Sequence, residues 1–153
     1  MNPKINDQLL VQLVLATKNE TVLSDKEFRE EVWKEIYRIV TDRGHKCIII
    51  NGNENHVHIL IELRPFMSLS DLANEIKQSS SIFINKGKMT DDRFEWQEGF
   101  GAFSHSQSQL GMIYAYIDNQ EEYHKNKTFR EEYINFLRSL NIDIDDSHII
   151  NRM

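Results

Sequence analysis

The order in which strand-like and helix-like segments follow one another is the feature that most restricts the fold of this chain. Residues 9–17 form a continuous apolar run of strand length, and residues 25–43 then place apolar side chains at helical spacing between charged ones. Read in this way, strands are expected at 9–17, 46–51, 56–63 and 94–97, and helices at 25–43, 68–85, 108–125 and 128–140. This order predicts an α+β fold, a ferredoxin-like split-βαβ antiparallel sheet with helices on one face and additional C-terminal helices.

Local signals predict where these elements begin and end. Ser24 with Glu27 forms a possible capping box for the first helix, and Gly44 is suited to end it. Gly52 and Asn53 are expected to form the turn of a hairpin between the second and third strands. Residues 99–101 contain two glycines, which predict a backbone bend before the helix at 108–125.

The length and composition of the chain indicate one ordinary globular domain. A chain of 153 residues with 40% hydrophobic and 27% charged residues can bury a core, so we expect a single domain over residues 1–153. Cys47 is the one cysteine, which excludes a disulfide framework and a cysteine-type zinc site. Because no signal peptide is visible and the apolar runs are too short to span a bilayer, we expect a cytoplasmic protein.

The charge of the chain disfavours one class of DNA-binding protein. A formal net charge of −6 argues against a protein that depends on non-specific affinity for DNA. The acidic residues cluster late in the chain, at Glu121-Glu122, Glu131-Glu132 and residues 143–146. A groove elsewhere can therefore still be basic.

His56 and His58 are the first candidates for a functional site. They lie two residues apart in an expected strand, so both side chains point from one face, while Val57 and Ile59 point from the other. Neutral imidazoles bind first-row divalent ions, and two of them leave positions open for substrate oxygens. The alternative is a pair of strand histidines that only form hydrogen bonds.

Tyr116 and Gln120 lie four residues apart in the helix expected at 108–125, so they share one side of it. With Ile113 and Ile117 they form a stripe that ordinarily packs against a core, but an amide at its end suits a metal site better than a core. Tyr116 is then the candidate nucleophile. Tyr123, seven residues further on, is the competing candidate, whereas Tyr114 points to the opposite side of the helix.

These residues together resemble the HUH single-tyrosine transposases of short insertion sequences and REP-associated elements. That family has His-hydrophobic-His on a central strand and a catalytic Tyr on a later helix, with Gln one turn beyond. His56-Val57-His58, Tyr116 and Gln120 match this pattern, residues 96–104 and 116–122 also look like the family, and the similarity runs over residues 9–149. The chain departs from it at Asn55, where members often have Asp, and at Gln12, where many have His.

The resemblance implies a reaction, a cofactor and partners. The reaction is cleavage and rejoining of single-stranded DNA through a 5′-phosphotyrosine on Tyr116, with Mg²⁺ or Mn²⁺ on His56, His58 and Gln120. The implied partners are DNA with a subterminal hairpin and a second copy of the chain. Candidate DNA contacts are Arg64, Lys77, Lys86, Lys88, Arg93 and, for base stacking, Trp96.

Three other functions compete with this interpretation. A domesticated or inactive HUH-fold protein would bind nucleic acid without transposition, and the sequence does not distinguish it from an active enzyme. A non-catalytic RNA-recognition module would need exposed aromatic residues where the third strand offers histidines. A phosphodiesterase with two His-x-Thr/Ser motifs does not match, because the chain has one His-x-His pair.

A nucleotide cofactor is not expected, since the sequence has neither a P-loop nor a dinucleotide fingerprint.

Overall fold

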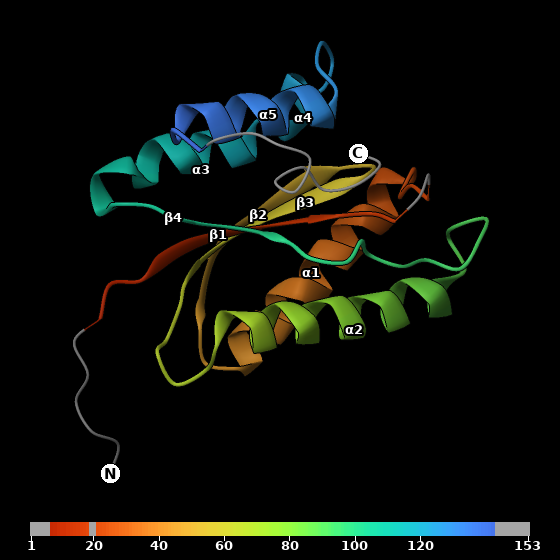
Figure 1. Cartoon of the computed structure of the whole chain (residues 1–153). Helices are drawn as coiled ribbons and strands as arrows, with labels where there is room; N and C mark the ends of the chain where they lie inside the picture. The colour runs from red at the N-terminus through yellow and green to blue at the C-terminus, as the bar shows by residue number, and fades with distance from the viewer. Residues whose placement is uncertain (1–6, 19–20, 143–153) are drawn as a thin grey trace.

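The sheet of the molecule has the strand order expected from the sequence. The computed structural model describes residues 7–18 and 21–142. Its four strands are β1 (Leu10–Ala16), β2 (Lys46–Asn53), β3 (His56–Glu62) and β4 (Gly101–Ser104). They pair in the antiparallel order β2-β3-β1-β4, with β3 and β1 in the centre (Figure 1), which confirms the split-βαβ arrangement. The domain expected over residues 1–153 extends beyond the described residues at both ends. The acidic segment 143–146 lies outside them.

Two helices cover one face of this sheet. They are α1 (Lys26–Asp42) and α2 (Leu69–Gly87), which lie side by side below the sheet in Figure 1. Val57 and Ile59 of β3 pack there against Ile36 of α1 and Ile76 of α2 in the largest apolar cluster. This cluster is the main hydrophobic core of the described chain.

The C-terminal helices cover the opposite face (Figure 1). They are the short 3₁₀ helix η1 (Gln107–Gln109) followed by α3 (Leu110–Asp118), α4 (Gln120–Tyr123) and α5 (Phe129–Ser139). Two smaller apolar clusters hold them to the sheet; one contains Leu60 and Ile117, and the other contains Val14 and Phe129. Helices on both faces therefore enclose the side chains of β1 and β3. Among the described residues, none of the helices has the length and apolar character needed to cross a membrane.

Several expected boundaries shift in the structure. Asp25, and not Ser24, caps α1, because its carboxylate accepts hydrogen bonds from the backbone N–H groups of Glu27 and Phe28. Ser68 caps α2 by accepting a hydrogen bond from the backbone N–H of Asp71. The hairpin turn is at residues 54–55, since the two residues expected to form it continue β2 and pair with Val57 and His56.

The fourth strand lies later than expected. Residues 94–97 make one isolated bridge, between Thr17 and Trp96, instead of a strand. The indole of Trp96 is turned into the α1/α2 core and donates to Ser80 at 2.8 Å, and backbone hydrogen bonds from Lys18 to Glu95 and from Gln97 to Ala16 hold this segment beside the end of β1. The backbone bends at Gly99, which has a φ of 78°, and the continuous pairing of β4 with β1 begins at Gly101.

The helix expected at 108–125 is divided at Asn119. The side-chain amide of Asn51 on β2 donates to the carbonyl oxygens of Ile117 and Asp118, at 3.1 Å each. These carbonyls would accept within a continuous helix, so their use by the sheet separates α3 from α4. Tyr116 and Gln120 consequently lie on two successive helices.

The β2–β3 hairpin that carries His56 should depend on Gly52. A Cβ atom at this position would meet the carbonyl oxygen of His56 and would lie 2.8 Å from the Cα atom of Val57, both of which are backbone atoms. We predict that Gly52→Ala lowers the free energy of unfolding by about 1–3 kcal/mol, measured by urea denaturation. Gly111→Ala is the matched control, because nothing lies within 4 Å of its Cβ position. A Gly52→Ala protein as stable as the wild type would contradict this account of the hairpin.

Candidate active site

His56 and His58 present their imidazoles on the sheet face that α3, α4 and α5 cover. Both residues are buried, at 1% exposure each, while Val57 and Ile59 point into the core on the other face. The two rings meet edge to face, with their centroids 5.1 Å apart. The ring of His56 also stacks on Phe129 of α5, at a centroid distance of 3.9 Å. Strand alternation therefore brings both imidazoles to one place, as predicted.

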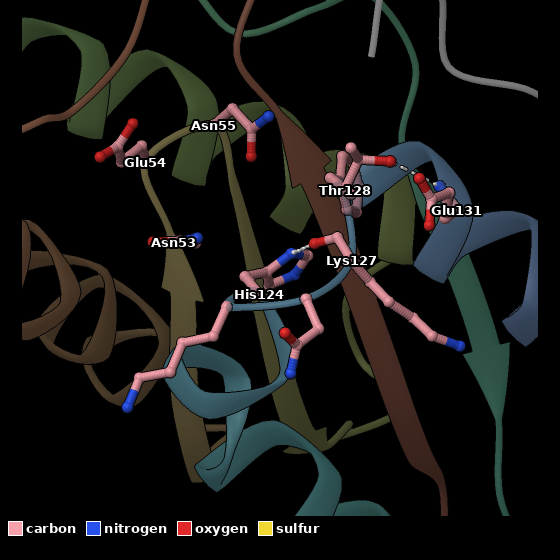
Figure 2. Close-up of a pocket in the computed structure, with 10 residues that line it drawn as sticks. Asn53, Glu54, Asn55, His124, Lys127, Thr128 and Glu131 are labelled. Carbon is pink, nitrogen blue, oxygen red and sulfur yellow. Dashed lines mark hydrogen bonds between the residues drawn. The ribbon is translucent and has the colours of Figure 1, made fainter.

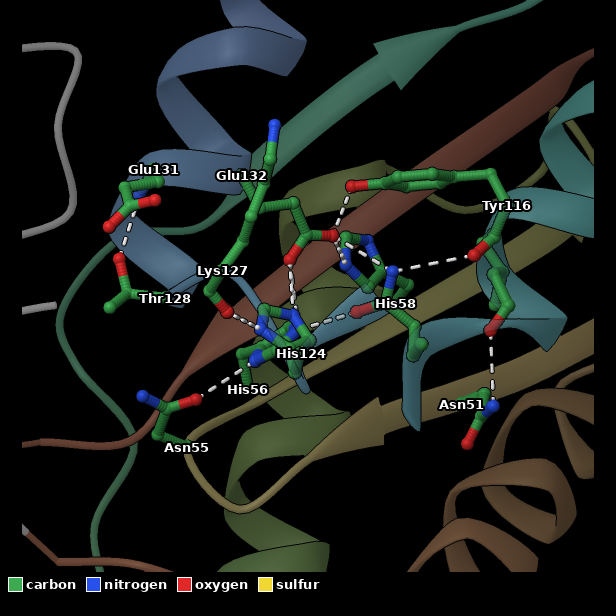
Figure 3. A network of polar contacts seen from close by, with 12 residues as sticks. Asn51, Asn55, His56, His58, Tyr116, His124, Lys127, Thr128, Glu131 and Glu132 are labelled. Carbon is green, nitrogen blue, oxygen red and sulfur yellow. Dashed lines mark hydrogen bonds and ion pairs between the residues drawn. The ribbon is translucent and has the colours of Figure 1, made fainter. Parts of the chain in front are cut away.

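Tyr116 of α3 and Gln120 of α4 contact these imidazoles from the helices that cover this face of the sheet. The Tyr116 ring lies edge to face with the His58 ring, with centroids 5.5 Å apart. The Oε1 atom of Gln120 lies 2.8 Å from the Nε2 atom of His56. The four residues expected from the sequence to form a site are thus brought together within one chain, and Figure 3 labels three of them, His56, His58 and Tyr116.

The other two tyrosines near this helix have different surroundings. The Tyr123 ring lies against the Tyr116 ring, with centroids 5.8 Å apart, and the Lys127 ammonium lies 5.7 Å from its centroid. Tyr114 is 43% exposed, on the other side of α3. Of the three, Tyr116 is the one whose hydroxyl is hydrogen-bonded at the centre of the site.

The centre of the site is a residue that the sequence analysis grouped with the surface acids. Glu132 of α5 is 1% exposed, and its carboxylate accepts hydrogen bonds from the Tyr116 hydroxyl and, at 2.8 Å, from the Gln120 amide. The same oxygen, Oε1, lies 3.2 Å from the Nε2 atom of His58. The other oxygen lies 2.6 Å from the Nε2 atom of His124 (Figure 3). The buried Glu132 carboxylate therefore links the imidazoles of His58 and His124 to the phenol of Tyr116.

The sequence contains a signal that could have identified this carboxylate. Phe129, Tyr133 and Leu137 are the buried apolar residues of α5, and Glu132 falls on the same stripe. A charged residue on the inward stripe of an amphipathic helix is unusual unless it is paired. His124 has a weaker signal, because it lies in the connection between α4 and α5, where its Nδ1 atom donates to the carbonyl of Lys127.

Burial and the Glu132 charge set the protonation of the site. Burial lowers the pKa of His56 to about 3, so this imidazole is neutral. Burial alone would raise the pKa of Glu132, but hydrogen bonds from His124 and His58 hold it well below its ordinary range. For Tyr116, burial and then the negative charge of Glu132 raise the pKa well above that of a free phenol. The site thus combines a neutral imidazole, a carboxylate and a protonated phenol.

The two ring nitrogens of His56 have an arrangement that suits a metal ligand. Nδ1 lies 2.9 Å from the side-chain oxygen of Asn55, which can only accept, so the single ring proton belongs on Nδ1. The lone pair of Nε2 then faces the Gln120 oxygen, which is also an acceptor. A cation between the two atoms would satisfy both, and the Asn55 contact would hold the ring in the required tautomer.

The arrangement as a whole fits a divalent ion. His56, His58 and Glu132 each offer one ligand atom, and these atoms all lie within 4.8 Å of one another. Gln120 adds an amide oxygen beside His56. Imidazole nitrogens combined with carboxylate and amide oxygens are a donor set for first-row divalent metals, Mn²⁺ included.

A hollow of about 370 Å³ opens next to the site, beside His124 (Figure 2). Side-chain amides line it at Asn53, Asn55 and Asn126, together with two lysines and two glutamates. It adjoins the site directly, because Asn55 binds His56 and Phe129 stacks on the same ring. The hollow is large enough for a small ligand group of mixed polarity.

The candidate DNA contacts do not join this site. Lys77 on α2 donates to the backbone carbonyls of Gln97 and Gly99, and Arg93 and Trp96 lie near it around a second hollow. Trp96 is 6% exposed, so its ring does not present a face to a base. The remaining cations lie at the ends of elements: Arg64 follows β3 and pairs with Asp7, while Lys86 and Lys88 are at the end of α2.

Comparison with known proteins places this geometry in a family context. The family described as "Transposase IS200 like" matches residues 6–120. A candidate transposase from Deinococcus radiodurans R1 superposes with a TM-score of 0.61 at 18% identity, over 78% of this chain and 96% of that chain. A REP-associated tyrosine transposase bound to a REP hairpin gives 0.60 at 14% identity, over 81% and 74%. No protein of curated function matches in sequence. The family match includes His56, Tyr116 and Gln120 and ends before His124 and Glu132.

The Glu132–His124 pair should be visible in the titration of the metal-free protein. The burial of His124 lowers its pKa, but the hydrogen bond to Glu132 outweighs burial and raises it. We predict by NMR that the His124 pKa is above the ordinary value of about 6.5 and falls below it in Glu132→Gln. Because the raised pKa belongs to the folded state, this stabilisation is complete at lower pH and is lost as the pH rises through that value.

His45 is the control for this titration, since burial lowers its pKa and it makes no contact with Glu132. Its pKa should be the same in both proteins. An unchanged His124 pKa in Glu132→Gln would show that the carboxylate does not control this ring.

Proposed function

The chain belongs to the family of IS200-like transposases, and from this premise we propose that it cleaves and rejoins single-stranded DNA through a covalent bond to Tyr116. The observation that carries the proposal is the convergence of the Tyr116 hydroxyl, the imidazoles of His58 and His124 and the Gln120 amide on the buried Glu132 carboxylate, with His56 bound to the same amide side chain. A tyrosine hydroxyl can act as a covalent nucleophile, and a divalent ion beside it can activate the phosphate that it attacks.

We further propose that the site uses Mg²⁺ or Mn²⁺. His56, His58 and Gln120 would hold the ion, and Glu132 would supply a charged oxygen beside them. Because the pKa of Glu132 lies well below its ordinary range, the carboxylate remains charged near neutral pH and attracts a cation. When bound, such an ion withdraws charge from a phosphate oxygen and makes the phosphorus easier to attack.

Tyr116 is held in a resting state by the contacts that surround it. Its hydroxyl donates to Glu132, and the charge of that carboxylate helps to keep the phenol protonated. Any cation that offsets this charge lowers the pKa of the phenol. In the cleavage step the Oη–P bond forms, the bond from phosphorus to the 3′ oxygen breaks, the phenol loses its proton and the 3′ oxygen gains one. A second 3′-OH can reverse the step, because the covalent link remains a phosphodiester.

The proposed substrate is single-stranded DNA that carries a subterminal hairpin. Support comes from the structural neighbour, which is bound to a REP hairpin, and from the hollow beside His124, whose amides can face bases next to the scissile phosphate. Arg64, Lys77, Lys86, Lys88 and Arg93 are retained as proposed contacts to DNA at a distance from Tyr116. Trp96 is not retained, because its ring is buried.

A homodimer and a single domain over residues 1–153 are further proposals, the first resting on the family resemblance and the second on the length of the chain. In the described chain the Tyr116 ring contacts His58 of the same chain. A dimer would hold two DNA ends near each other for rejoining.

The test of the proposed function is formation of the covalent adduct. Phenylalanine at position 116 keeps the ring packing against His58 and Phe136 and removes the oxygen. We predict that Tyr116→Phe folds and binds DNA but forms no adduct with labelled single strands of the element end and Mn²⁺, resolved on a denaturing gel. Tyr123→Phe, the matched control, should form the adduct at close to the wild-type level.

Two outcomes would contradict the proposal. An adduct that persists in Tyr116→Phe and disappears in Tyr123→Phe would assign the nucleophile to the wrong tyrosine. Cleavage by the wild type with no protein-linked product would indicate hydrolysis by water.

A further inference from the structure

Gln12 is a buried amide that the proposed reaction does not use. It lies on β1, is 0% exposed, and contacts a histidine at each end of its side chain. Its Nε2 atom is 3.0 Å from the Nδ1 atom of His58, and its Oε1 atom is 2.7 Å from the Nε2 atom of His105. Because β3, β1 and β4 are neighbours and His105 directly follows β4, the three side chains form a row across the sheet. Gln12 contacts His58 at Nδ1, the ring nitrogen that faces away from Glu132.

The hydrogen bonds of this row determine where the proton of His58 lies. The Gln12 NH₂ group donates to Nδ1, so the neutral His58 ring carries its proton on Nε2, which faces Glu132 at 3.2 Å. His105 in turn donates its Nε2 proton to the Gln12 oxygen. In this arrangement the Nε2 atom of His58 has no free lone pair for a metal ion.

A metal ion on Nε2 of His58 requires the opposite arrangement. The ring proton must then be on Nδ1, where it would face the Gln12 NH₂ group, donor against donor. A half-turn of the Gln12 amide removes this conflict, since its oxygen then accepts from His58. The NH₂ group now faces Nε2 of His105, which can accept only if the His105 proton has moved to Nδ1.

We propose that Gln12 and His105 form a relay that sets the tautomer of His58. The direction of its hydrogen bonds reverses when a metal ion binds to His58. Gln12 can serve both states because an amide carries a donor at one end and an acceptor at the other. His105 can follow it, since its ring is 9% exposed and its hydrogen bond to Gln12 uses Nε2, which leaves Nδ1 to take the proton. The relay rests on the proposed function, because it presupposes a metal ion on His58. Gln12 and His105 are positioning residues, which act through His58.

The first test is the affinity for Mn²⁺, measured by calorimetry on the full chain. We expect Gln12→Leu to weaken binding about 10–100-fold, as the loss of an outer hydrogen bond to a ligand histidine commonly does. Gln12→Glu should bind at least as tightly as the wild type, because a carboxylate accepts from Nδ1 of His58. The matched control is Gln97→Leu. Gln97 is also a buried glutamine, but its amide donates to the backbone carbonyl of Thr17 and not to a histidine. Circular dichroism establishes that each variant is folded.

The second test follows the protons directly. Imidazole ¹⁵N NMR with and without Mg²⁺ should show the proton of His105 on Nε2 in the metal-free protein and on Nδ1 in the loaded protein. Gln12→Leu should abolish this change. His45 is the control ring, since its Nδ1 atom accepts from the backbone N–H of Arg64 in a different part of the sheet. A merely structural amide would leave the tautomer of His105 independent of the metal.

The possible results separate the relay from the metal site itself. If His58→Ala weakens Mn²⁺ binding but Gln12→Leu does not, or if the His105 proton stays on Nε2 when Mg²⁺ is bound, the relay is overturned and the metal site stands. If His58→Ala binds Mn²⁺ as tightly as the wild type, the proposed metal site fails and the relay fails with it.

Discussion

The buried Glu132 carboxylate is the interaction on which the rest of the site depends. A charge that is 1% exposed is costly unless it is paired, and Glu132 is paired by donors from three other elements and one connection. These contacts hold α3, α4 and α5 to the sheet at the point where His56 and His58 emerge. The same contacts fix the position of Tyr116. The hydrogen bonds that hold the C-terminal helices to the sheet are therefore the same ones that form the site.

The same contacts keep the proposed nucleophile protonated. The charge of Glu132 is balanced by His124 and by donors that include the Tyr116 hydroxyl, and burial together with this charge raises the pKa of the phenol. In the proposed reaction the Glu132 carboxylate needs another partner. A divalent ion would be that partner, and the proposed relay from Gln12 to His105 would adapt His58 to its binding. Metal loading, release of the phenol and the tautomer of one imidazole are then linked through a few buried hydrogen bonds.

The sequence predicted the parts of this molecule that follow local periodicity. Strand alternation predicted that His56 and His58 share a face, and the order of the segments predicted the sheet. It did not predict the break at Asn119, because the side chain responsible, Asn51, lies 66 residues from the carbonyl it contacts. Glu132 was missed for a related reason, since a carboxylate beside another acid looks solvent-exposed until the stripe of α5 is considered. The family match ends at residue 120, so family similarity gave no information on Glu132 either.

The central claim is that His56 and His58 bind one ion at the Glu132 carboxylate, next to Tyr116. Anomalous X-ray diffraction from crystals soaked in Mn²⁺ tests it most directly. The account predicts one manganese peak bonded to Nε2 of both imidazoles and to an oxygen of Gln120 or Glu132, with the Tyr116 hydroxyl beside it. Manganese bound only at surface carboxylates, with the Glu132 hydrogen bonds unchanged, would contradict the account.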